Sequence, residues 1–264
     1  MSILSLKTKV DTYFNNTKSN IFDGLSYSSD SLFINSKKLN KKLIIAENNS
    51  EAERLYKELK ILSDSEEIIF IPGTEEMPYD MVDSDRYINS SKNLNLIRYL
   101  KSSKKNIIVI TTIKNLHKKL LSKEVILEET ITLKNKMDID LDDLKNNLIN
   151  IGYINNPQVN FHGEFSIRGS IVDIYPGGYN SPIRVDLDDI NIETIKYFNT
   201  DNQMTYGSLI DENIYIVPMS NIITKENNII NFRKKFREIF EGNPNDNEIY
   251  SGISNGLLPQ GLNN

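Results

Sequence analysis

The stretch from Phe161 to Phe198 constrains the fold most, because its side chains alternate between apolar and polar in successive short runs. A side-chain period of two is typical of strands with one buried face. Glycine or proline separates the runs, as in Gly169 and Pro176-Gly177-Gly178. The pattern predicts three consecutive antiparallel strands, with Arg168 and Arg184 on neighbouring strands. We expect a small sheet whose polar edge binds another protein.

The first 126 residues show a different pattern, in which short apolar runs alternate with amphipathic helical segments. A helix is predicted after the run at Lys42–Ala46, with Ser50 as its N-cap and Glu53 completing a capping box. Strands that are apolar throughout are typical of a parallel sheet with helices on both faces. We predict an α/β, Rossmann- or helicase-like domain over residues 1–126. Its strands are expected at Leu32–Ile34, Lys42–Ala46, Ile68–Ile71 and Ile107–Thr112.

Sheets of this kind often bind nucleotides through a loop of the form G-x-x-x-x-G-K-[ST], whose backbone N–H groups and lysine hold phosphates. The corresponding stretch, from Gly24 to Ser31, has one glycine, no lysine, and an aspartate, Asp30, that would repel phosphate. The dinucleotide motif G-x-G-x-x-G is missing as well. We therefore predict a domain that lacks a functional phosphate loop.

Beyond residue 126 the pattern indicates an α+β arrangement. A strand is predicted at Thr130–Leu133, and a helix that ends at Gly152 follows it. We predict an inserted α+β domain over residues 127–211 and a return segment to the α/β domain over residues 212–264. The return segment is expected to hold a strand near Ile214 and a helix from Lys225, with Ile229, Phe232, Phe236 and Phe240 as its core face. The last residues contain no helix stop, so we expect a truncated sequence.

Composition argues against several classes of function. The net charge of -5 disfavours a chain that wraps nucleic acid unaided, because phosphates require clustered Lys and Arg. With no cysteine and only His117 and His162, a thiolate or histidine-rich metal site is excluded, and we predict no metal, cofactor or catalytic residue. No apolar run approaches the roughly 20 residues that cross a bilayer, and the N-terminus lacks a signal-peptide pattern. We expect a soluble, cytoplasmic protein.

The segment Gly163–Pro176 carries a recognisable motif. It reads GEFSIRGSIVDIYP and resembles the signature G-x-[FY]-x-x-R-G-x-[IL]-[IL]-D-[IL]-[FY]-P of the UvrB interaction domain. That domain occurs in the excision-repair protein UvrB and in bacterial transcription-repair coupling factors (Mfd). Ile71–Asp80, with Thr74 in place of a tryptophan, and Ile249–Gly261 resemble two further segments of the coupling factors. The sequence is thus similar to the N-terminal, UvrB-like module of that family.

The resemblance implies that the inserted domain recruits the damage-recognition protein UvrA through Arg168, Arg184, Asp186 and Leu187. A guanidinium presents a rigid fork of donors to carboxylates, and two arginines flanking an acid form a charge pattern specific to one partner. The alternative is that each arginine forms an intramolecular surface ion pair worth ~0–1 kcal/mol. Coupling factors have an aromatic pair after this acid, whereas this chain has Leu187 and Asp188, so an apolar anchor is missing at the second position.

The resemblance also implies that ATP and Mg²⁺ are cofactors of motor domains outside this chain, and that RNA polymerase and double-stranded DNA bind outside it too. The sequence favours a recruitment module of transcription-coupled repair. Two alternatives stay open. A UvrB-type, ATP-dependent excision-repair protein requires a phosphate loop, and a small-molecule α/β enzyme requires a deep pocket lined by converging ionisable groups.

Overall fold

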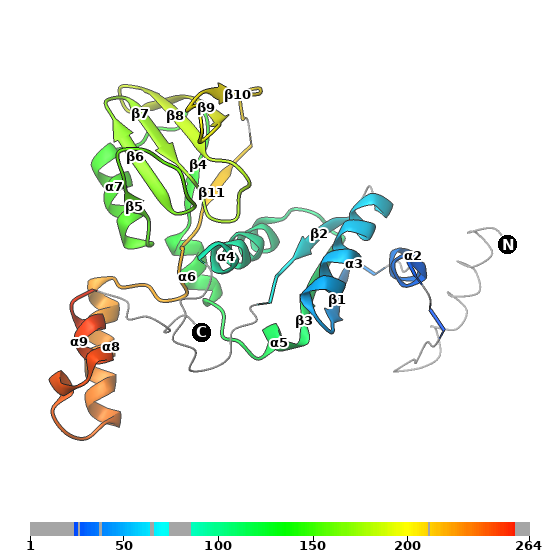
Figure 1. The fold of residues 1–264 in the computed structure, drawn as a ribbon, viewed down its shortest axis with the longest axis horizontal. Coiled ribbons are helices and arrows are strands. Elements are labelled where there is room, and N and C mark those ends of the chain that lie inside the picture. Colours follow the sequence, from blue (N-terminus) through cyan, green and yellow to red (C-terminus); the bar gives the residue numbers. More distant parts are fainter. Residues whose placement is uncertain are drawn as a thin grey trace. The chain divides into compact units, whose positions relative to one another are not determined.

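Three parallel strands form one sheet, in the order β1-β3-β2. In the computed structural model, β1 spans Lys41–Ala46, β2 spans Glu67–Phe70 and β3 spans Ile107–Thr112 (Figure 1). The structure describes residues 24–25, 27–36, 39–63, 66–73, 86–210 and 212–256. Ile107 in the central strand lies opposite Lys41 on one side and Glu67 on the other. The predicted parallel sheet is therefore confirmed.

One face of this sheet is covered by α3 (Asn49–Leu62), and α2 (Ser29–Ser36) contacts α3 in turn. The short α5 (Ile113–Leu116) follows β3. These elements belong to one compact unit, made of the described residues up to Gly73 and Lys101–Lys118, while the second unit holds the rest of the described chain. The core of the first unit is formed by Ala46, Ala52, Leu55, Leu59, Ile108 and Ile110.

Two local predictions in the first unit are wrong. Leu32–Ile34 lies in α2, not in a strand, because the contact of α2 with α3 overrides the weak local β preference of three apolar residues. The N-cap of α3 is Asn48, whose side chain accepts a hydrogen bond from the Glu51 N–H at 2.9 Å, so Ser50 lies inside the helix. Asn and Ser are equally good N-caps, so composition alone does not choose between them.

The second unit contains a six-stranded sheet in the order β10-β9-β8-β7-β6-β5. The stretch expected to hold three strands holds four antiparallel ones, β6 to β9 (Figure 1). The extra turn, at Asp189-Ile190, contains neither glycine nor proline; Asp189 adopts φ 56, a conformation that aspartate tolerates. The strands are β5 (Ile154–Asn155), β6 (Glu164–Arg168), β7 (Ile171–Ile174), β8 (Ile183–Asp188), β9 (Asn191–Phe198) and β10 (Thr205–Tyr206).

A separate two-stranded ladder joins the two ends of this region. β4 (Ile131–Leu133) pairs antiparallel with β11 (Ile214–Ile216), so that Ile131 lies opposite Ile216 and Leu133 opposite Ile214. The strands predicted at Thr130–Leu133 and near Ile214 are confirmed. The chain therefore enters and leaves the six-stranded sheet at one place, which is the topology of an inserted domain. The predicted limits of 127 and 211 lie within a few residues of this ladder but stay a prediction.

The core of the second unit gathers apolar residues of the six-stranded sheet and of the β4–β11 ladder. The helices α6 (Lys123–Glu129) and α7 (Leu141–Asn150) contribute to it, as do Leu94 and Ile97. α7 is the helix predicted from its apolar spacing, and Leu144 and Leu148 are buried in the core. Gly152 follows the helix with φ 93, as expected of a glycine after a helix C-terminus.

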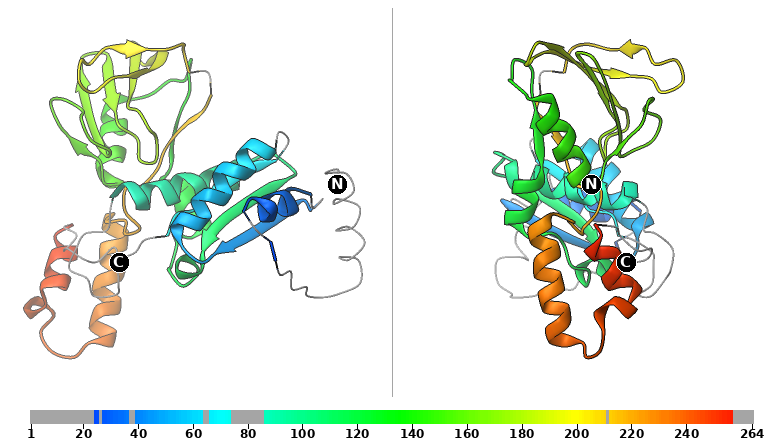
Figure 2. Two further views of the ribbon diagram at one scale, coloured as in Figure 1. Left: turned by 45° about the vertical axis from the view of Figure 1, so that its right-hand side comes forward. Right: turned by 90° about the vertical axis from the view of Figure 1, so that its left-hand side faces the viewer.

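The C-terminal part of the described chain forms a helical pair. α8 (Glu226–Ile239) lies beside α9 (Glu248–Ser254), and a 3-10 turn at Pro244–Asp246 precedes α9 (Figure 2). No residue of α8 is buried. Phe232 and Phe236 instead stack on Tyr250 of α9, with ring centroids 5.9 and 4.9 Å apart, so the expected core face of α8 serves the contact between two helices. Within the described ranges no helix is long and apolar enough to cross a membrane.

Two glycines attach the six-stranded sheet to α4 (Arg86–Lys101). Gly178 has φ 79, which explains its place in the predicted turn. Gly177 is required for another reason, because a Cβ atom there would lie 2.2 Å from the Cβ of Ser90. The Gly177 N–H also donates to the Tyr153 hydroxyl at 3.0 Å. The Pro176-Gly177-Gly178 turn is therefore also a packing contact.

We predict that Gly177→Ala destabilises the protein by roughly 1–3 kcal/mol, because overpacking at a tight contact displaces neighbouring groups. Ser90→Gly removes both side-chain atoms of Ser90 that the new methyl group meets. Gly177→Ala combined with Ser90→Gly should therefore be more stable than the sum of the two single changes predicts. Urea unfolding of the four proteins measures this coupling, and additive losses would contradict it.

Candidate protein-docking site

The polar face of the six-stranded sheet carries the predicted site residues. Phe165 and Ile167 of β6 point to the core, so Ser166 and Arg168 lie on the opposite face. Ser166, Asp173, Arg184 and Lys196 lie directly opposite one another across β6, β7, β8 and β9. Side chains of the same face on adjacent strands are close enough to interact. We call the surface around Arg168, Asp173, Arg184 and Asp186 the arginine face.

Both arginines pair with one carboxylate, that of Asp173. This side chain has 0% exposure, and Arg184 grips it with two bonds, Nε to Oδ1 at 2.6 Å and Nη2 to Oδ2 at 2.9 Å. Arg168 also donates to Oδ2, from its Nη2. Asp173 therefore serves as the shared partner of two nearby cations. A buried carboxylate is strongly destabilising unless such partners satisfy it, so both ion pairs support the sheet.

The strand order corrects one expectation. Arg168 on β6 and Arg184 on β8 are not on neighbouring strands, since β7 lies between them and supplies the shared Asp173. The intramolecular alternative is thus present in the structure. It does not exclude docking, because the two arginines carry two positive charges against the single charge of Asp173.

Arg184 is held on several sides. Its guanidinium lies 5.0 Å from the centre of the Phe198 ring, and its Nη1 donates to the Gln203 carbonyl at 3.1 Å. The hydrogen bonds to Asp173 raise the pKa of Arg184 above its usual value, so the group stays charged. Phe198 and Gln203 are neighbours of Arg184 that the sequence did not predict, since neither belongs to a charge pattern.

Arg168 is far more accessible. Its side chain is 49% exposed, compared with 17% for Arg184. It ends β6 at a tight turn through Gly169, whose φ of 60 suits glycine. About half of the Arg168 side chain is therefore accessible to a partner.

The other predicted contacts divide between the two faces of β8. Asp186 lies on the arginine face and accepts a hydrogen bond from the Thr194 hydroxyl at 2.8 Å. Leu187 is a core residue with 6% exposure, so it supports the sheet from within and is not presented to a partner. Asp188 is exposed and follows Arg184 and Asp186 in the alternation, which places it on the arginine face.

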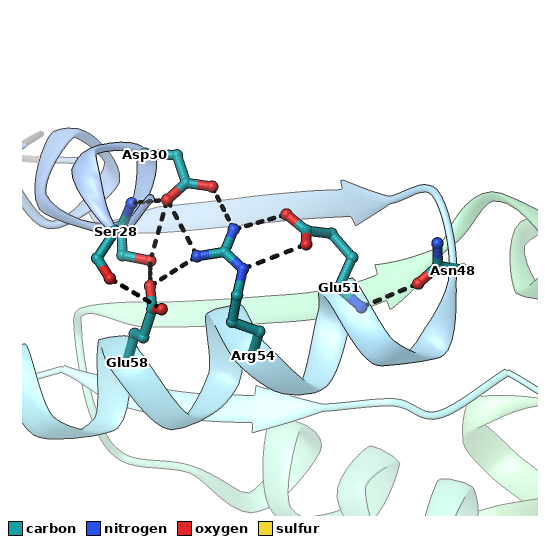
Figure 3. Close-up of polar contacts among 7 residues, drawn as sticks. Ser28, Asp30, Asn48, Glu51, Arg54 and Glu58 are labelled. Carbon is teal, nitrogen blue, oxygen red and sulfur yellow. Dashed lines mark hydrogen bonds and ion pairs between the residues drawn. The ribbon is translucent and has the colours of Figure 1, made fainter. Parts of the chain in front are cut away.

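The stretch from Gly24 to Ser31, which lacks the motif of a phosphate loop, belongs to the first unit and runs into α2. There Arg54 of α3 pairs with Asp30, Glu51 and Glu58 at 2.5, 2.6 and 2.8 Å (Figure 3). The hydroxyl of Ser28 donates to Glu58 at 3.0 Å. These carboxylates occupy the donors of Arg54, so the cluster couples α2 to α3.

The cluster shifts the pKa values of its members. Burial pushes the pKa of Asp30 upward, but hydrogen bonds from Arg54 and the Ser31 N–H outweigh it, and the net pKa is lowered. The Ser31 hydroxyl, followed by Arg54 and Ser28, lowers the pKa of Glu58 despite partial burial. Across the described part of the chain, no group of three or more His, Asp or Glu side chains is placed to hold a metal ion.

The strands that bear the arginine face lie within a recognised family segment: residues 131–221 match the model of the UvrB interaction domain. Its first and last strands, β4 and β11, lie inside this match. Residues 131–221 are a UvrB interaction domain. The predicted domain of residues 127–211 overlaps this match over most of its length.

The similarity to known proteins extends beyond the UvrB interaction domain. The chain as a whole is 30% identical over 221 residues to the transcription-repair-coupling factor of Haemophilus influenzae, a match that covers 83% of this chain and 19% of that protein. The Escherichia coli K12 factor is 27% identical over 220 residues, with the same coverage. The Staphylococcus aureus NCTC 8325 factor is 28% identical over 250 residues, covering 91% of this chain and 21% of its own. This chain thus spans about one fifth of the length of these relatives.

The segments that motivated the resemblance are only partly described. Thr74–Asp80 and Leu257–Gly261 lie outside the described residues. The motif at Gly163–Pro176 is described throughout and forms β6, β7 and the turn between them, within the UvrB interaction domain.

We expect the α2–α3 cluster to weaken in acid. Asp30 and Glu58 have pKa values below their ordinary ones in the folded chain, so their contribution is complete above about pH 5 and is lost as the pH falls through the lowered values. Arg54→Ala should cost about 1 kcal/mol at pH 7, a modest value because these groups are partly solvated, and should reduce this pH dependence.

Urea unfolding at pH 7 and pH 4 measures both effects. Lys57→Ala is the matched control, because it removes an exposed i,i+4 pair with Glu53 from the same helix and should change the stability by less than about 0.5 kcal/mol. An unchanged pH dependence in Arg54→Ala would show that the cluster does not contribute in this way.

Proposed function

We propose that this chain recruits the excision-repair protein UvrA through the arginine face of its UvrB interaction domain. The observation that carries the proposal is the half-exposed Arg168 guanidinium next to Arg184, on the sheet that matches this domain family. Arginine is favoured where planar, bidentate recognition of carboxylates is needed. The site consists of Arg168, Arg184 and Asp186, with Leu187 supporting them from the core.

Local charge supports a protein partner with acidic groups. The chain as a whole has a net charge of -5, yet this face brings Arg168 and Arg184 together around one buried carboxylate, with Arg168 half-exposed. Complementary charge increases the association rate and selects among partners. Asp186 adds an acceptor beside the arginines, so the face has both signs in a fixed order.

In the longer protein, we propose that this recruitment serves transcription-coupled repair, in which UvrA is brought to RNA polymerase stalled at damaged DNA. The relatives are named transcription-repair-coupling factors, and the similarity extends over more than four-fifths of this chain. ATP and Mg²⁺, RNA polymerase and double-stranded DNA would then be bound by parts of the protein other than residues 1–264. We place the protein in the cytoplasm, where these partners work.

We further propose that the three-stranded α/β unit binds no nucleotide. The stretch from Gly24 to Ser31 lacks the glycines and lysine of a phosphate loop, and its Asp30 brings negative charge to the start of α2. The alternative is a UvrB-type, ATP-dependent repair protein. Calorimetric titration of the chain with Mg-ATP separates the two, since measurable binding would favour the alternative.

The UvrA interaction predicts a specific loss. Arg168→Ala combined with Arg184→Ala should weaken the binding of purified UvrA at least about tenfold, because arginines at the centre of an interface commonly contribute 1.4 kcal/mol or more. Biolayer interferometry with the immobilised chain measures the affinity, and circular dichroism checks that the variant is folded.

Lys234→Ala combined with Lys235→Ala is the matched control. It also removes two positive charges, but from α8, outside residues 131–221. This variant should bind UvrA as the unaltered chain does. Failure of the unaltered chain to bind, or equal binding by both double variants, would refute the proposed function.

A second prediction concerns Asp188. Because it is exposed on the arginine face at a position that is aromatic in coupling factors, Asp188→Phe should tighten UvrA binding by roughly three- to tenfold, through apolar area and removal of a negative charge. Asp188→Asn separates the two contributions, since it changes the charge alone. Unchanged affinity in both variants would show that position 188 is peripheral to the contact.

A further inference from the structure

We propose that Asp173 is the positioning residue of the arginine face and that it gives the two arginines different roles. The Arg184 side chain is held in place and stabilises the sheet. The Arg168 side chain is accessible and binds one carboxylate of the partner. This inference rests on the proposed function, because it assigns roles within the same site.

Asp173 is placed so that it cannot turn away from the arginines. It lies on the middle strand, opposite Ser166 on one side and Arg184 on the other, with no exposed surface. Polar contacts hold the chain over this part of the sheet: the Ser166 hydroxyl donates to the Pro157 carbonyl, and the Gln203 side chain donates to the Thr200 carbonyl at 2.7 Å. A buried carboxylate in such a setting fixes the direction of the groups that bind it.

Arg184 has few donors left for a partner. Its Nε and Nη2 bind Asp173 and its Nη1 binds the Gln203 carbonyl, so all three nitrogens are engaged. Its guanidinium lies beside Phe198, which has 0% exposure. Two N–H groups of Arg184 are left, but its side chain is only 17% exposed, so it offers little surface to a partner.

Arg168 is in the opposite condition. A guanidinium has five N–H donors, and within the described structure only Nη2 of Arg168 is engaged, by Asp173. The side chain is half-exposed at the end of its strand. The free N–H groups of Arg168 can therefore bind a carboxylate. Because the bond to Asp173 already limits the rotation of this side chain, less conformational entropy is lost on binding.

The free donors indicate which arginine takes a partner carboxylate. Arg168 uses one of its five N–H donors, whereas Arg184 uses three. Asp186 adds a second carboxylate to this face and interacts electrostatically with Arg184, so the charges of the two arginines and the two aspartates balance. A partner carboxylate is therefore expected at Arg168, where most of the free donors lie.

The different roles of Arg168 and Arg184 can be tested without UvrA, by nuclear magnetic resonance of the arginine side chains in the whole 264-residue chain. Sodium acetate serves as the carboxylate probe. We expect the Nε–Hε signal of Arg184 to exchange slowly with water and to be unmoved by acetate, whereas the signal of Arg168 should exchange rapidly and shift. In Asp173→Asn, which keeps the shape but removes the charge, the Arg184 signal should lose its slow exchange.

A second set of measurements compares Arg168→Lys with Arg184→Lys. Both variants keep the positive charge but lose the planar guanidinium group. Arg184→Lys should lower the midpoint of thermal unfolding by several degrees, and Arg168→Lys by less. Arg168→Ala should weaken UvrA binding at least tenfold and flatten its dependence on salt, with Lys235→Ala as the charge control. Arg184→Lys should leave the salt dependence of UvrA binding unchanged.

The possible failures are distinguishable. Equal acetate shifts for the two arginines, or equal loss of thermal stability in the two lysine variants, overturn the division of roles even when UvrA binds. Absence of UvrA binding by the unaltered chain overturns the proposed function, and the acetate and unfolding experiments then still decide whether Asp173 separates the two arginines.

Discussion

The arginine face depends on the burial of one carboxylate. Asp173 is inaccessible to water in the middle of a sheet, where an unpaired charge would destabilise the fold by several kcal/mol. Its two oxygens are satisfied by arginines from the strands on either side, so the same contacts that make the burial tolerable also set the spacing of the arginines. The Phe198 ring and the Gln203 carbonyl then complete the surroundings of Arg184. Stability and recognition are therefore linked at this one residue.

Much of this arrangement could be predicted from the sequence, because alternation identifies which residues share a face. That rule placed Arg168 and Arg184 on one sheet, and the family resemblance added Asp186. It could not show that a whole strand separates the two arginines, since the turn at Asp189-Ile190 has no glycine or proline and strand order depends on distant pairing. The burial of Leu187 follows from the same alternation, although the resemblance placed this residue among the contacts with a partner.

The first unit shows the same limit in another form. Its parallel strands could be predicted because they are apolar throughout, a local property. α2 could not, because its helical state depends on α3, through a cluster in which Arg54 gathers three carboxylates. Charged residues far apart in the sequence give no periodic signal, so such a cluster is visible only once the helices are placed. The stretch that ends at Ser31, expected to be a loop before a strand, therefore runs into α2, which the cluster around Arg54 joins to α3.

The pairing of β4 with β11 has a consequence for how such a domain can be inherited. Because its first and last strands are hydrogen-bonded neighbours, the chain enters and leaves the six-stranded sheet through a base two strands wide, beside the contact of Gly177 and Gly178 with α4. A gene segment that encodes a unit of this kind can enter or leave a host protein with little change to the path of the host chain. The arginine face can therefore be inherited together with its whole domain, by proteins that differ in function.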